Sequence, residues 1–206
     1  MKTFFHSGVV LLVLSHVTPV AAQDLVEAEL RQGYYLGVAA SGGVGRAEDG
    51  DLGGLGSGLE LGGRLRIGQM FSPDWGAGFL LLGGVTSTRD FSGVGGGVGL
   101  ELTLYPFDGL DLALRPSVGL LVNGYSRDDS LLETSDDPMS LYAARIANSV
   151  TYDLWCWSDA GESGGMCLTA GVDFALGQSD DLRTVSAVGL IEVQQFWGLA
   201  KERLLD

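Results

Sequence analysis

Eight charged residues of this sequence lie in segments where every second residue is apolar, and they are the first candidates for chemistry. Carboxylates in pairs can act as general acid and base, and an arginine can hold a carboxylate with its planar fork. A charge removed from water without a partner is costly, so equal numbers of each sign indicate mutual neutralisation. No spacing places two of the carboxylates in a cleft, as hydrolysis would require. The eight residues are Glu60, Arg64, Arg66, Glu101, Arg115, Arg145, Asp173 and Glu192.

Histidine chemistry is excluded from most of the chain. Both histidines, His6 and His16, lie in the first 22 residues. Residues 23–206 therefore contain no imidazole base, no Ser-His-Asp triad and no H-E-x-x-H zinc site. We expect no catalysis, no cofactor and no metal site. A cluster of acids over 128–137 is dense enough to hold calcium, but its spacing is not that of an EF-hand loop, and a solvated acidic loop is favoured.

Two cysteines, Cys156 and Cys167, are candidates for a disulfide. They follow a leader that predicts export to an oxidising compartment, and they are close in sequence. Two thiolates alone would leave a tetrahedral metal ion half coordinated, so a metal site is disfavoured. The two residues have opposite parity in the alternating pattern around them, so a direct cross-strand bridge requires a β-bulge or a pairing beyond the regular ladder.

The first 22 residues predict a secretory signal peptide. Lys2 precedes the apolar run 8–14, and small residues at 20–22 form a cleavage site, whereas the run is too short to span a bilayer as a helix. All 26 acidic residues follow this leader, against 12 Lys and Arg in the whole chain. Because no basic patch is present, nucleic acid is not expected as a partner.

The rest of the chain alternates apolar and polar residues with a period of two, which predicts β-strands. The glycine-rich pieces, such as residues 93–99, lack the pattern of a phosphate-binding loop and run directly into an alternating segment, so they are interpreted as strand. We expect one domain over 23–197 and a C-terminal tail over 198–206. Eight strands are predicted, over 33–45, 57–70, 75–87, 93–106, 110–124, 140–155, 166–177 and 184–197.

Aromatic residues gather at one end of this predicted sheet and acids at the other. In an up-and-down arrangement, the connections after the second, fourth and sixth strands share an end with both termini of the sheet. Flat amphipathic rings favour the interface between a membrane and water. We expect a girdle there of Tyr34, Tyr35, Phe71, Trp75, Tyr105, Phe107, Trp155, Trp157, Phe196 and Trp197.

The alternating strands, the strand–turn–strand LTLYPFDGLDLALRP (102–116) and the segment GLIEVQQFW (189–197) resemble the OmpA/OmpX-type outer-membrane barrels of Gram-negative bacteria. One departure is that nine residues follow Trp197, whereas such barrels commonly end on an aromatic. The resemblance implies an all-β, eight-stranded antiparallel up-and-down transmembrane β-barrel in the outer membrane. It also implies a structural or surface-interaction role, periplasmic termini, extracellular acidic loops, outer-membrane lipid and lipopolysaccharide as partners, and a monomer.

Two alternatives stay open. One is a soluble secreted or periplasmic lipocalin-like barrel that binds a small apolar ligand, and the other is a channel for ions or small solutes. The parity of the apolar residues separates the first from a membrane barrel, because apolar residues face outward only in lipid. An eight-stranded barrel has just enough interior for side chains to fill, which favours a plugged interior over a channel. Asn148 does not fit, because it falls on the proposed lipid face beside Ile146 and Val150.

Overall fold

The computed structural model describes residues 31, 33–49, 53–87, 91–107, 109–127, 139–157, 164–179 and 182–198. The expected leader, residues 199–206 of the expected tail and most of the acidic connections lie outside these residues. No helix in the described part of the chain is long and apolar enough to cross a bilayer.

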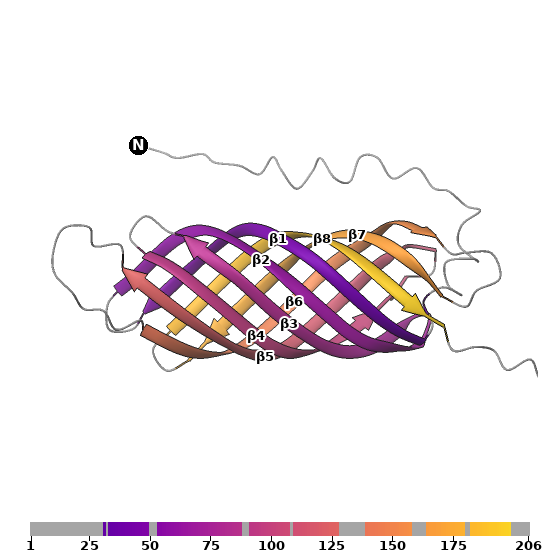
Figure 1. Cartoon of the computed structure of the whole chain (residues 1–206), viewed down its shortest axis with the longest axis horizontal. Coiled ribbons are helices and arrows are strands. Elements are labelled where there is room, and N and C mark those ends of the chain that lie inside the picture. Colours follow the sequence, from indigo (N-terminus) through magenta and orange to yellow (C-terminus); the bar gives the residue numbers. More distant parts are fainter. Residues whose placement is uncertain are drawn as a thin grey trace, which may run out of the picture.

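Eight antiparallel strands form a closed barrel and confirm the expected all-β, up-and-down fold (Figure 1). Every strand pairs with its neighbours in chain order, and β1 closes the ring by pairing with β8, where Val38 lies opposite Val193. The strands run obliquely to the long axis of the barrel (Figure 1). They are β1 Gly33–Asp49, β2 Gly53–Ser72, β3 Trp75–Ser87, β4 Phe91–Leu104, β5 Leu112–Arg127, β6 Met139–Trp157, β7 Gly164–Gln178 and β8 Leu182–Trp197.

The two ends of the barrel differ in their connections. We call the end that carries the short β2–β3 turn and the β4–β5 connection the turn end, and the opposite end the loop end. Most strands are a few residues longer than predicted, because ladder pairing continues past the apolar stretch, as where Glu48 pairs with Arg183. All strands exceed the roughly 9–11 residues that a tilted strand needs to cross a bilayer.

The apolar parity of every strand faces outward. Successive side chains of a strand point to opposite faces, so one parity covers the exterior and the other fills the lumen. Large apolar side chains on all eight strands are 51–68% exposed. One from each strand, in order, is Val38, Ile67, Phe79, Leu100, Val118, Ile146, Phe174 and Ile191.

A β-bulge in β6 changes its parity near the turn end. The pairing of β6 with β7 shifts between Asp153 and Trp155, so that Leu154 and Trp155 both face outward. Beyond the bulge Cys156 lies directly opposite Cys167. The bulge is therefore what brings together two cysteines of opposite sequence parity.

Candidate functional site: the charged barrel interior

The central cluster of the lumen joins two arginines to two glutamates. The Nη1 atom of Arg66 lies 2.6 Å from Glu192, and Arg66 also pairs with Glu101. Arg115 approaches the other oxygen of Glu192 at 2.8 Å and donates to the amide oxygen of Gln194 at 3.1 Å. All five side chains are buried. Glu192 on β8 thus bridges arginines from β2 and β5, and the cluster ties strands from different sides of the wall.

A second cluster lies nearer the loop end and is centred on Asp173. Arg64 and Arg145 approach the same carboxylate oxygen at 2.5 and 2.7 Å. The hydroxyl of Ser149 donates to the other oxygen at 2.6 Å and accepts from Arg64 at 3.2 Å. Three donors, one from β2 and two from β6, engage both oxygens of Asp173, so this carboxylate is held as a cross-strand acceptor.

Glu60 differs from the other seven charged residues. Its side chain is half-buried and makes no ion pair with any described residue, although Arg64 and Arg145 are its charged neighbours. These three residues line a cavity of about 120 Å³ in the loop-end half of the lumen, whose walls are mostly glycine, serine and threonine. The structure therefore brings seven of the eight predicted charges into direct ion pairs and leaves Glu60 beside a solvent-sized space.

Glycines make room for the largest interior side chains. A Cβ atom at Gly68 would lie 2.5 Å from the ring and hydroxyl of Tyr35 and 2.5 Å from the carbonyl of Ala77. On the next strand, a Cβ atom at Gly78 would also lie 2.5 Å from the Tyr35 hydroxyl. The rings and carboxylates of a narrow barrel can lie flat against the wall only where a neighbouring strand has no side chain.

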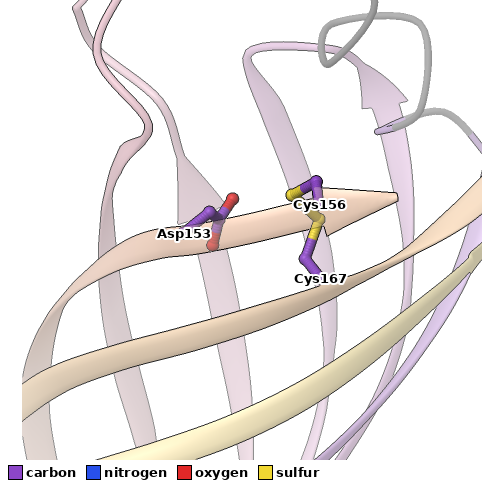
Figure 2. Close-up of side chains that lie close together, drawn as sticks. All are labelled: Asp153, Cys156 and Cys167. Carbon is purple, nitrogen blue, oxygen red and sulfur yellow. A yellow bond between two sulfur atoms is a disulfide. The ribbon is translucent and has the colours of Figure 1, made fainter. Parts of the chain in front are cut away.

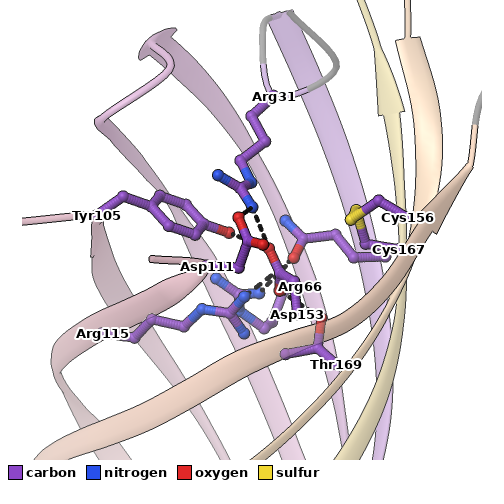
Figure 3. The surroundings of a disulfide bond; sticks show 10 residues. Arg31, Arg66, Tyr105, Asp111, Arg115, Asp153, Cys156, Cys167 and Thr169 are labelled. Atoms are coloured by element: carbon purple, nitrogen blue, oxygen red, sulfur yellow. Dashed lines mark hydrogen bonds and ion pairs between the residues drawn. A yellow bond between two sulfur atoms is a disulfide. The ribbon is translucent and has the colours of Figure 1, made fainter. Parts of the chain in front are cut away.

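A third cluster closes the turn end, and we call it the rim cluster: Arg31, Tyr105, Asp111, Asp153 and Thr169 (Figure 3). Arg31 pairs with Asp111, lies 3.1 Å from Asp153 and stacks 4.2 Å above the centre of the Tyr105 ring. Asp153 accepts hydrogen bonds from Tyr105 at 3.0 Å and from Thr169 at 2.8 Å. Burial, reinforced by the charge of Asp153, raises the pKa of Tyr105 above its ordinary value, so Tyr105 remains a neutral donor.

The disulfide between Cys156 and Cys167 lies beside the rim cluster, inside the barrel wall (Figures 2 and 3). Both cysteines are buried, and their Cα atoms are 4.1 Å apart across β6 and β7. Asp153 is close enough to complete a three-ligand group with them. The sulfurs are consumed in the disulfide, however, and both Asp153 oxygens accept hydrogen bonds, so this group fits a structural role and not a metal centre.

Seven of the ten expected girdle residues face outward at or near the turn end. They are Tyr34, Phe71, Trp75, Phe107, Trp155, Trp157 and Trp197, each between 43% and 63% exposed. Phe71 stacks on Trp75 with ring centres 4.6 Å apart, and Trp155 meets Trp157 at 5.9 Å.

The other three, Tyr35, Tyr105 and Phe196, are at most 6% exposed and lie in the interior. This corrects the expectation that all ten form one outward girdle. Tyr34 and Tyr35 are adjacent on a strand, as are Phe196 and Trp197, so only one of each pair can face outward. Tyr105 shares the parity of Glu101 and points inward like it.

Several interior residues were missed by sequence reasoning. Arg31 precedes the first predicted strand, and no pattern placed it. Asp153, Ser149 and Thr169 share the inward parity of their strands, so the period of two was a usable signal for them. Because each carboxylate in the three clusters is held by arginine, the arrangement provides cross-strand ties.

No family model and no curated protein sequence matches this chain. Solved structures do match it in fold. The attachment invasion locus protein Ail of Yersinia pestis is 10% identical, with 80% of this chain and 98% of that chain covered at a TM-score of 0.48. Neisserial surface protein A is 15% identical, with 80% and 97% covered at 0.48. The N-terminal β-barrel domain of Pseudomonas aeruginosa OprF is 15% identical, with 78% and 96% covered at 0.44. The chain is similar to these small outer-membrane proteins in one respect, the closed eight-stranded antiparallel barrel.

Proposed function

We propose that residues 23–197 form an integral outer-membrane barrel with a structural or surface-interaction role, exported by the leader 1–22 and not catalytic. One observation carries the proposal: large apolar side chains are exposed on all eight strands around an interior that holds the charges. Such a surface is stable in lipid, where a closed barrel also satisfies every backbone hydrogen bond. In water the same surface would be an apolar area far larger than a soluble monomer exposes.

The proposed orientation places the turn end and both termini in the periplasm and the acidic connections outside the cell. The support is the seven outward aromatic residues at the turn end, which suit the headgroup layer. The acidic segments at the loop end would then meet the lipopolysaccharide surface, where divalent cations can bridge carboxylates and phosphates. Lipid and lipopolysaccharide are accordingly the proposed partners.

We propose further that the lumen is closed to diffusion. From the loop end to the turn end, the Asp173 cluster, the central cluster and the rim cluster lie in succession along it, and each joins strands from different sides of the wall. The channel alternative is favoured by one observation, the cavity beside Glu60, which belongs to the loop-end half only. Conductance of the protein in planar bilayers separates the two, since a plugged barrel gives no steady open level.

The lipocalin-like alternative requires the reverse arrangement. A soluble carrier places its apolar parity in the core around an apolar ligand. In this barrel that parity faces outward, and the interior presents Arg66, Arg115 and their carboxylate partners. An apolar ligand would displace charges from their partners, which is strongly unfavourable.

Fractionation tests the membrane proposal directly. The mature protein should sediment with the outer membrane, require detergent for extraction and show heat-modifiable mobility on a gel. A protein that remains soluble without detergent, and whose mobility is unchanged by boiling, would refute the membrane location. A protein that inserts and conducts steadily would refute only the closed lumen.

A further inference from the structure

Asn148 is a polar side chain on the largely apolar exterior, at the middle of β6, whereas the outward Gln69 and Gln195 each lie two residues from an outward aromatic residue at the turn end. Asn148 faces outward and is exposed, with Ile146 and Val150 before and after it on the same face. It makes no hydrogen bond to any described residue. On the neighbouring strands its register partners are Pro116 and Phe174, so no polar side chain flanks it there either.

The depth of Asn148 keeps its amide away from water. It is seven residues from the outward Trp155, which corresponds to roughly 16 Å along the barrel axis for a strand tilted by about 45°. The apolar band of an outer-membrane barrel is about 25 Å tall, so the amide lies well inside it. The asparagine side chain is too short to reach either interface, as a lysine or arginine would.

A backbone defect lies beside Asn148. The ladder between β4 and β5 is paired up to Glu101 with Ser117 and resumes only at Leu104 with Leu114. The interruption covers two positions, Leu102 opposite Pro116 and Thr103 opposite Arg115, and Pro116 has no N–H to donate to a neighbouring strand. In lipid, an unsatisfied backbone group costs several kcal/mol. A break in the ladder and an outward amide thus lie side by side in the lipid-facing wall.

The surface around this defect is hollowed. Pro116, Ile146, Leu100 and Phe79 line a wide, largely apolar depression on the exterior of β2 to β6. Asn148 lies next to it, opposite the lining residue Pro116 in the ladder. A second body seated there would meet apolar side chains across the depression and the amide of Asn148 at the edge. A partner on this surface must therefore fit the depression and also form a hydrogen bond with the Asn148 amide.

We propose that the exterior of β4–β6 around Asn148 and Pro116 is a self-association surface, on which a second copy of this chain packs in the plane of the membrane. An amide carries one donor group and one acceptor, so two Asn148 side chains related by a twofold axis satisfy each other. A twofold contact uses the same patch on both copies and needs no other polar residue from the partner. The sequence contains no oligomerisation motif and predicts a monomer; the outward amide is the reason to propose a dimer. This inference rests on the proposed membrane location.

Cross-linking in vesicles tests the dimer. The protein is refolded into phosphatidylcholine vesicles, and heat-modifiable mobility is checked first, so a failure to insert is recognised as failure of the membrane proposal. Ile146→Cys should give a dimer with a short bismaleimide, because Ile146 is on the same outward face of β6 and the substitution leaves Asn148 in place. Val38→Cys is the matched control, because it is equally outward-facing on β1, on the other side of the barrel. It should remain monomeric.

A second variant distinguishes association through the Asn148 hydrogen bond from non-specific apolar association. Asn148→Val should fold normally and lower the association constant, measured by energy transfer between labelled copies, by roughly 3- to 15-fold, the range for one or two hydrogen bonds between membrane segments. An unchanged association constant would overturn the proposal. So would equal cross-linking at both cysteine positions, or cross-linking in native membranes only to other proteins.

Discussion

The guanidinium of Arg115 on β5 and the carboxylate of Glu192 on β8 form an ion pair of 2.8 Å across the lumen, with both side chains 1% exposed. Glu192 is at the same time bound to Arg66 from β2. A pair of this kind cannot be evaluated alone, because removing either charge leaves the others buried and only partly neutralised.

Replacing Arg115 by leucine should therefore destabilise the barrel strongly. Removing one partner of a buried pair typically costs about 3–5 kcal/mol. Reversible urea unfolding of vesicle-inserted protein measures the change. Arg183→Leu is the matched control, because Arg183 is an exposed residue of β8, and its loss should change stability by less than about 1 kcal/mol. Equal effects of the two substitutions would contradict the role of the central cluster.

Arg66 should not be replaceable by lysine. Its Nε and Nη atoms reach Glu101, Glu192 and the hydroxyl of Thr103 at the same time. A lysine has one compact ammonium group and cannot hold both carboxylates with this geometry. Arg66→Lys should cost about 1–3 kcal/mol, the price of a buried charged group losing hydrogen bonds. An unfolding free energy equal to that of the wild type would show that the fork is not required.

Much of this interior could be predicted from the sequence, because period two determines the face of each residue once a strand is recognised. The seven paired charges share the parity opposite to the leucines, and so do Asp153 and Thr169. The opposite parity of Cys156 and Cys167 also predicted either a bulge or a pairing beyond the regular ladder, and the structure has the bulge. The alternation with period two does not predict which strands lie across the lumen from one another, and so it does not predict which charges pair.

The misplaced aromatics have a different origin. Tyr35, Tyr105 and Phe196 were assigned by residue type and position near an end, although parity placed each inside. The space for Tyr35 comes from Gly68 and Gly78 on two other strands. Because these glycines are far from Tyr35 in the sequence, no local pattern around Tyr35 predicts the space that they provide. Arg31 is a similar case, since its acidic partners come from residues 111 and 153.

Gly68 should tolerate no side chain. In Gly68→Ala the new methyl would lie 2.5 Å from the Ala77 carbonyl and from the Tyr35 ring, so the wall and the ring must both shift. Overpacking of this kind costs about 1–3 kcal/mol. Gly63→Ala on the same strand is the control, because its methyl would meet only the Ala39 carbonyl at 3.5 Å. Thermal unfolding of the two variants in the same detergent should separate them clearly; matching midpoints would argue against the close packing of Tyr35.

The disulfide should stabilise the barrel mainly by restricting the unfolded chain. Cys156 and Cys167 close a loop of sequence separation 11, for which loop-entropy arguments give about 2–3 kcal/mol. The double variant Cys156→Ala, Cys167→Ala should lose this amount in urea unfolding under oxidising conditions. Reduction provides the control: a thiol reductant added to the unfolded protein should bring the wild type close to the double variant. If reduction leaves the unfolding free energy of the wild type unchanged, the stability lost in the double variant comes from side-chain packing and not from the disulfide bond.

The rim cluster should protect the chain at Arg31 from proteolysis. The Arg31 side chain is held by Asp111, Asp153 and the face of Tyr105, so it is not available to the specificity pocket of trypsin. Asp153→Asn removes the charge that anchors Arg31 from the inner side and also weakens the hydrogen bond from Tyr105. We expect trypsin to cleave after Arg31 at least several-fold faster in this variant, measured by mass spectrometry of detergent-solubilised protein.

Asp74→Asn is the control. It removes an exposed acid from the β2–β3 turn at the same end of the barrel and should leave the cleavage rate unchanged, because Asp74 forms no ion pair with Arg31. If both variants accelerate cleavage equally, loss of charge at this end, and not the rim cluster, controls access to Arg31; if neither does, the cluster does not hold the chain there.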